Sequence, residues 1–134
     1  MRILVIDAQG GGVGKQLVSK IKAEIKDVEV VAVGTNALAT SAMLKAGADV
    51  ASTGENSIVY SSARADLIVG PMGIAMPNAM NGEITPRMAE AVSGARAARI
   101  LIPFRNCDHI MVGVKDLSVS ALVDLAVEEI KNMV

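Results

Sequence analysis

The chain has 134 residues, enough for one domain with a single hydrophobic core. Hydrophobic residues make up 51% of the sequence and charged residues 20%, a composition that excludes an intrinsically disordered chain. The net charge is −1, and one Phe, one Tyr and no Trp offer few stacking surfaces, so we expect no nucleic-acid partner.

The chain opens as a strand, a glycine-rich turn and a helix. The predicted strand is residues 2–6, whose apolar run 3–6 ends at Asp7, and four glycines follow within the five positions 10–14. Apolar residues at positions 17, 18, 21 and 25 then recur with the spacing of a helix. We expect bare backbone N–H groups at the head of this helix, where the helix dipole favours an anion such as phosphate.

Short apolar runs predict further strands, and helical spacing predicts helices between them. The predicted strands are residues 28–33, 48–51, 67–69 and 100–102. The predicted helices run from a cap at Thr35 or Asn36 to Gly47, weakly over residues 58–63, from Thr85-Pro86 to Gly94, and from a cap at Ser118 or Ser120 through Ile130.

A sixth strand is predicted at residues 110–112, another apolar run. Only about seven residues separate it from the strand at 100–102, whereas a parallel return needs a crossover of about a dozen or more residues. We therefore expect these two strands to form an antiparallel hairpin at the edge of the sheet.

Strands that alternate with helices predict an α/β fold over residues 1–134, a single three-layer Rossmann-like domain. Its sheet is expected to be mostly parallel, with about five strands, the antiparallel sixth at the edge, and helices on both faces. In such sheets ligands bind beyond the carboxyl ends of the strands, so the turns after the strands form one predicted rim. The predicted ligand-binding residues are Asp7, Gln9, Gly10, Gly11, Gly12, Val13, Gly14, Lys15, Gly34, Thr35, Asn36, Thr53, Glu55, Asn56, Gly70 and Pro71.

The rim predicts a nucleotide or other phosphorylated small molecule as ligand, and a nucleotide or dinucleotide as cofactor. Gly12-Val13-Gly14 resembles the glycine motif of short-chain dehydrogenases, but Arg64 stands where their catalytic lysine would follow Tyr60. Gly14-Lys15 resembles the end of a P-loop, but Gln16 replaces the Ser or Thr that holds magnesium. Neither enzyme class is therefore predicted.

Two features of the rim stay open. The acidic residue expected about 20 residues after the glycines, to bind an adenosine ribose, is missing, because the second strand ends in Gly34-Thr35-Asn36. Asp7 could bind a metal or a ribose, or it could secure the turn through backbone N–H groups.

An alternative function is a small enzyme that uses Cys107 as nucleophile and His109 as base. Both residues fall in the turn after the strand at 100–102, which the hairpin would place on the rim. Two such side chains do not make a zinc site, so no metal is predicted. The competing interpretation is a buried thiol and a hydrogen-bonded imidazole.

A third hypothesis is a non-catalytic oligomeric scaffold. The segment 72–88 carries Met72, Met76, Met80 and Met88 with few charges, and methionine adapts to irregular surfaces. These residues are ordinary core, a subunit interface or a flexible lid over the glycine loop, and the high apolar content favours a homo-oligomer.

The sequence resembles a family of short bacterial proteins with a Rossmann-like fold that is described only as a conserved domain of unknown function. The family usually carries glycine where this chain has Ala8. The resemblance implies the fold and no catalytic residue. It rests on residues 7–16, 34–47, 53–56, 70–73, 82–86 and 113–118.

We expect a cytoplasmic protein without a membrane partner. The longest apolar runs fall well short of the roughly 20 residues that span a bilayer, and no cleavage-type site follows the first one. A single cysteine cannot form an internal disulfide, which agrees with a reducing compartment.

Overall fold

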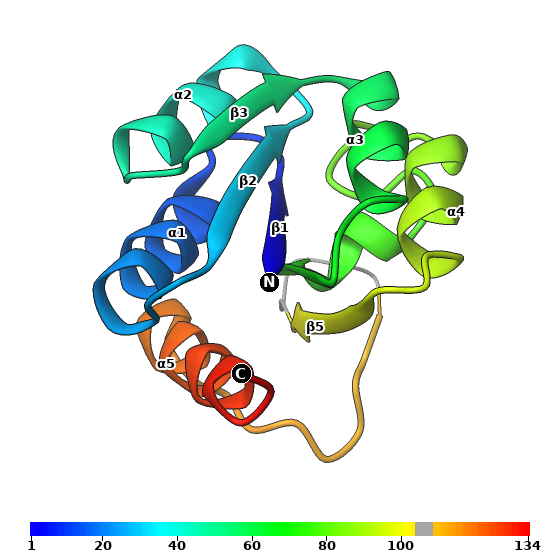
Figure 1. Ribbon diagram of the computed structural model, residues 1–134. Coiled ribbons are helices and arrows are strands. Elements are labelled where there is room, and N and C mark those ends of the chain that lie inside the picture. The colour runs from blue at the N-terminus through cyan, green and yellow to red at the C-terminus, as the bar shows by residue number, and fades with distance from the viewer. Residues whose placement is uncertain (104–108) are drawn as a thin grey trace.

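The computed structural model describes residues 1–103 and 109–134, and within them it has one five-stranded, wholly parallel sheet (Figure 1). The strands lie in the order β3-β2-β1-β4-β5, so the direction of winding reverses between β1 and β4. Ligands of open α/β sheets bind near such a reversal. The strands are β1 (Arg2–Asp7), β2 (Glu29–Gly34), β3 (Val50–Thr53), β4 (Leu67–Pro71) and β5 (Ala98–Ile102).

Helices cover both faces of this sheet, as predicted (Figure 1). One face carries α1 (Gly12–Glu24), α2 (Ala37–Lys45) and α5 (Val119–Lys131). The other carries α3 (Glu55–Ser62), the short 3₁₀ helix η1 (Met72–Ala75) and α4 (Pro86–Ser93). No helix of the described residues is long and apolar enough to cross a membrane.

The central strand β1 supplies both layers of the hydrophobic core. Ile3 and Val5 pack in the layer under α1 and α5, whereas Leu4 and Ile6 pack in the layer under α3 and α4. All four side chains are fully buried. Each such burial is worth about 1.5–3 kcal/mol, which fixes the register of β1 and so the position of the turn that follows it.

The helix boundaries follow the predicted caps. Asn36 accepts a hydrogen bond from the Ala39 amide, and Thr85 accepts one from Met88 with Pro86 at the first helical position. Ser118 caps α5 in the same way. Gly47 follows α2 with a φ of +116°, a conformation that glycine adopts without strain.

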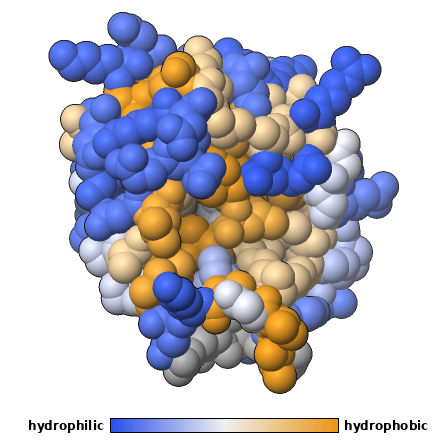
Figure 2. Space-filling view, turned by 90° about the horizontal axis from the view of Figure 1, so that it is seen from below, coloured by the Kyte–Doolittle hydropathy of each residue, from blue (hydrophilic) through white to orange (hydrophobic). Residues whose placement is uncertain are grey.

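The predicted sixth strand is wrong. Residues 109–118 form a loop without a strand, and Ile110 and Val112 are 92% and 96% exposed. The apolar run closes a turn in which the Val114 amide donates to the Met111 carbonyl, 3.3 Å away, around Gly113 with a φ of +83°. Within the described residues, 110–112 pair with no strand of the sheet. Figure 2 shows the lower face of the molecule, where apolar residues form a hollowed surface.

Candidate functional site

The parallel register brings the predicted rim together. Asp7 at the end of β1 pairs with Gly34 of β2, and Gly34 pairs with Thr53 of β3. The turns after these three strands therefore lie at one edge of the sheet. Residues 76–85, which connect η1 to α4, also reach this edge, because Glu83 and Thr85 hydrogen-bond to it.

Asp7 lies under the glycine turn and is only 4% exposed. One carboxylate oxygen accepts from the Ala8 amide at 2.8 Å and the other from the Gly14 amide at 2.7 Å. Burial raises the pKa of Asp7, and its backbone hydrogen bonds only partly oppose that effect. Asp7 thus secures the turn, and its carboxylate already complements the positive end of the α1 dipole.

Glu83 is the rim residue that sequence reasoning missed. Its Oε1 accepts three hydrogen bonds, from the Gln9 amide at 2.9 Å, the Thr35 hydroxyl at 2.7 Å and the Asn36 side-chain amide at 2.9 Å. Burial pushes the pKa of Glu83 up, but these three donors outweigh it, and the pKa lies below its ordinary value. The only sequence signal was an acidic side chain beside Gly82 in a segment with few charges.

Most amides of the glycine turn are already hydrogen-bonded, which corrects the expectation of a bare loop. The Gln9 amide donates to Glu83, the Gly11 amide to the Ala8 carbonyl, and the Gly14 amide to Asp7. Within the described residues, the amides of Gly10 and Gly12 have no acceptor. A Cβ atom at either glycine would meet nothing within 4 Å, so both positions border open space.

The other predicted rim residues divide into three groups. Thr53 shares a 2.7 Å hydrogen bond with the Thr40 hydroxyl, and Glu55 accepts from the Thr85 hydroxyl at 2.6 Å. Gly70 and Pro71 are buried, while Lys15 is exposed and Val13 half-buried on α1. The polar residues on this edge fall into separate hydrogen-bonded groups. They are Asp7, Gln9, Thr35, Asn36, Thr53, Glu55, Glu83 and Thr85.

The prediction for Cys107 lies outside the described residues, so a Cys107–His109 pair stays a prediction. His109 itself is exposed at the start of the loop that leads to α5. In the part of the chain that the structure covers, no three His, Cys, Asp or Glu side chains gather as metal ligands would.

The methionine-rich segment belongs largely to the core. Met72 is 5% exposed and Met88 4%, whereas Met76 and Met80 are half-buried. The scaffold hypothesis rests on a methionine surface at residues 72–88. Two of its four methionines, Met72 and Met88, are buried and cannot contribute to such a surface. A run of exposed apolar residues lies instead at 110–117, where Ile110 and Val112 are the most exposed.

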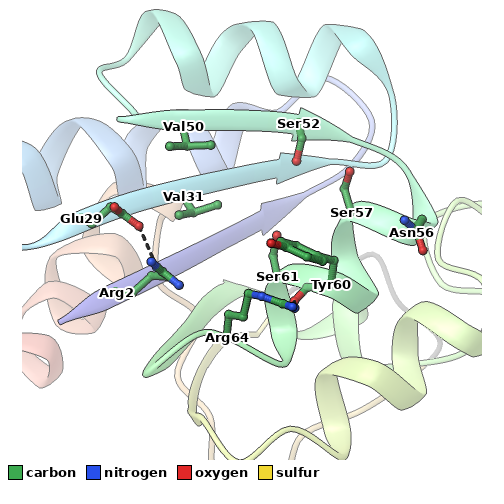
Figure 3. Close-up of a pocket in the computed structure, with 10 residues that line it drawn as sticks. All are labelled: Arg2, Glu29, Val31, Val50, Ser52, Asn56, Ser57, Tyr60, Ser61 and Arg64. Carbon is green, nitrogen blue, oxygen red and sulfur yellow. Dashed lines mark hydrogen bonds and ion pairs between the residues drawn. The ribbon is translucent and has the colours of Figure 1, made fainter.

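A cavity of about 360 Å³ lies away from the glycine turn, between α3 and the strands β1, β2 and β3 (Figure 3). Of the predicted ligand-binding residues, only Asn56 lines it. The sequence did not indicate this cavity, because its residues come from four elements and share no motif.

Residues 2–134 match the family model described as a domain of unknown function, DUF3842. The chain belongs to this family, which confirms the predicted resemblance. No curated protein matches the sequence. Among solved structures, the chain is similar to a dodecameric FMN-dependent Ubix-like decarboxylase from Escherichia coli O157:H7, with 17% identity and a TM-score of 0.48 over 98% of this chain and 76% of that one. A likeness this distant indicates neither a ligand nor an activity for the present chain.

Proposed function

We propose that this domain binds a nucleotide at the strand-end rim. In this proposal, Glu83 accepts hydrogen bonds from the ribose hydroxyls, and the amides of Gly10 and Gly12 donate to a phosphate. The observation that supports it best is that, in the part of the chain that the structure describes, only one carboxylate oxygen of Glu83 is occupied by hydrogen bonds. Oε1 takes three donors, while Oε2 has no partner within the described residues and remains available as an acceptor.

Glu83 supplies a carboxylate near the carboxyl end of β2, which has no acidic residue of its own. Dinucleotide-binding Rossmann domains hold the ribose with a carboxylate at the end of the second strand. Here Thr35 and Asn36 occupy that strand end, and both donate to Glu83, which arrives from the segment before α4. In this proposal, Glu83 therefore takes the part of the carboxylate that the end of β2 does not supply.

The charges at the rim make ribose recognition the stronger part of the proposal. Asp7 and Glu83 place two carboxylates near the turn, and Asp7 already complements the α1 dipole. A free phosphate dianion is therefore disfavoured. A hydrogen bond to a charged group is worth about 1.5–3 kcal/mol, so two amide donors can still hold a singly charged phosphate group, such as the α-phosphate of a nucleoside diphosphate.

The test compares Glu83→Gln with Glu90→Gln. The glutamine oxygen at position 83 can keep all three donors, whereas its NH₂ group replaces the free acceptor. Glu90 lies exposed on α4, so its substitution is the matched control. Calorimetry with the four common ribonucleoside diphosphates, and with 2′,3′-dideoxy forms of those that bind, measures the affinities.

We expect at least one ribonucleotide to bind, and Glu83→Gln and the dideoxy form each to weaken that binding about tenfold or more. Glu90→Gln should leave the affinity unchanged. No saturable binding of any of these nucleotides, or equal affinities for wild type and Glu83→Gln, would refute the proposal.

We also propose that the domain is a cytoplasmic homo-oligomer. Self-association is supported by the apolar loop before α5, where Ile110, Met111, Val112, Val114 and Leu117 are all exposed. Sedimentation velocity over a range of concentrations tests it. A monomer at every concentration would contradict the oligomer. An oligomer that a double substitution of Ile110 and Val112 by Ser leaves intact would contradict the loop as its interface.

A further inference from the structure

The cavity beside α3 has two apolar walls. Val31 and Val50 point from β2 and β3 toward α3, and the ring of Tyr60 faces them from the helix (Figure 3). Val50 is 49% exposed and Tyr60 57%, so the helix leaves this part of the sheet uncovered. The volume of about 360 Å³ falls within the range of about 300–1,000 Å³ that is typical of small-molecule sites.

The charged groups of the cavity are mostly cationic. Arg2 and Glu29 form an ion pair in which Nε lies 2.7 Å from Oε1. The Arg64 guanidinium lies 3.5 Å from the centroid of the Tyr60 ring, and its Nη1 donates to the Tyr60 carbonyl at 2.9 Å. The stacking holds Arg64 in place. Among the side chains that line the cavity, two guanidinium groups and one carboxylate leave an excess of one positive charge, and the Asp66 carboxylate lies beside it, 2.7 Å from the Arg2 amide.

Hydroxyl groups add to these donors. Ser57 and Ser61 lie one turn apart on α3, and Ser52 lies opposite on β3. Within the described residues, none of these three side-chain hydroxyls has a hydrogen-bond partner. The nitrogens Nη1 and Nη2 of Arg2 are likewise uncommitted there, because only Nε contacts Glu29. The cavity thus offers unused donors next to an apolar wall.

We infer that this cavity is a second binding site, for a small organic acid. In this proposal, the carboxylate of such a ligand accepts hydrogen bonds from the unused guanidinium nitrogens of Arg2, and its apolar body contacts Val31, Val50 and Tyr60. One excess positive charge matches a monoanion, and the apolar wall favours a carbon body over an inorganic ion. The site is independent of the nucleotide proposal, since Asn56 is the only predicted rim residue that lines it.

Tyr60 provides a direct readout, because it is the only tyrosine and the chain has no tryptophan. Benzoate serves as the probe, and benzyl alcohol is its uncharged counterpart. Tyrosine fluorescence is titrated with each compound for wild type, Arg2→Gln and Arg87→Gln. Arg87 is an exposed residue of α4 outside the cavity and is the matched control. Arg64 is left intact, since its contact with the ring would change the emission by itself.

We expect benzoate to change the emission of Tyr60 saturably. Benzyl alcohol should bind the wild type about tenfold more weakly than benzoate does, and Arg2→Gln should bind benzoate about tenfold more weakly than the wild type. Arg87→Gln should bind benzoate like the wild type, and so should Glu83→Gln, which separates this site from the rim. The inference is overturned if benzoate gives no saturable change, if benzyl alcohol binds as tightly, or if Arg2→Gln has no effect. A thermal melt of each variant confirms that it is folded.

Discussion

The rim and the cavity beside α3 are built in opposite ways. At the rim, Asp7 and Glu83 accept hydrogen bonds from the protein's own amides and hydroxyls. In the cavity, Arg2 and the serines keep donors that the described residues do not use. An acidic, internally bonded edge and an open cavity with free donors thus share one strand, β1. Changes at the rim should cost stability as well as the proposed nucleotide binding, whereas changes in the cavity should cost ligand binding alone.

The largest effect in this comparison is expected at Gly34, where the rim is tightly packed. A Cβ atom there would lie 2.5 Å from Thr40 Oγ1 and 2.6 Å from Thr40 N. Because backbone cannot yield as a side chain can, Gly34→Ala should lower the free energy of unfolding by about 3 kcal/mol. Gly10→Ala, which meets open space, should change it by less than about 0.5 kcal/mol. Urea denaturation measures both, and equal losses would show that the rim is not packed in this way.

The next effect separates the rim from the cavity directly. In Asp7→Asn one acceptor becomes an NH₂ group that must face the Ala8 or the Gly14 amide. Relief of the buried charge offsets part of that loss, and we expect a net destabilisation of about 1–3 kcal/mol. Ser57→Ala, in the open cavity, should stay within about 0.5 kcal/mol. If thermal and urea unfolding ranked the two variants the other way, the contrast between a hydrogen-bonded rim and an open cavity would fail.

A smaller difference is expected between two helix caps. Asn36 caps α2 and also donates from Nδ2 to the Gln9 carbonyl and to Glu83. Ser118 caps α5 through one hydrogen bond to the Ala121 amide. Asn36→Ala should therefore cost about 2 kcal/mol and Ser118→Ala about 1 kcal/mol of unfolding free energy. Equal costs would mean that the contacts of Asn36 with the rim contribute nothing.

The sequence predicted those parts of the fold whose signals are local. The apolar run of β1 followed by the glycine turn, the caps at Asn36 and Thr85, and Gly47 after α2 each depend on a few neighbouring residues. The third strand was placed too early, at 48–51 instead of Val50–Thr53. Asp49 looked like part of that strand, but its carboxylate accepts from the Val30 amide and from Lys22.

The candidate sites could be predicted only in part, because their decisive contacts join distant segments. Glu83 reaches the rim through a turn in which Asn78, Met80 and Asn81 all have positive φ, so no periodic pattern marks it. The cavity beside α3 depends on how much of the sheet that short helix leaves uncovered. The residues next to Glu83 and Tyr60 in the sequence therefore do not predict where these two side chains lie in the fold.

The smallest effect concerns pH, because Glu83 and Asp7 of the rim make stability depend on pH in opposite directions. The pKa of Glu83 lies below its ordinary value of 4.5, so its contribution to stability is complete above that pH and is lost as the pH falls through the folded-state pKa. Burial raises the pKa of Asp7 above its ordinary value of 3.8, so the stability linked to Asp7 is complete below that pH and is lost as the pH rises through its folded-state pKa.

Glu83→Gln isolates the first of these two effects. Because the side chain is partly exposed and screened, we expect wild type to exceed Glu83→Gln by no more than about 1 kcal/mol of unfolding free energy at neutral pH. That difference should shrink as the pH is lowered through 4.5, whereas the difference between wild type and Glu90→Gln should stay flat. Urea unfolding at a series of pH values measures both. A difference for Glu83→Gln that grew in acid would mean that its three donors do not favour the charged carboxylate, and the free acceptor on which nucleotide binding depends would lose its support.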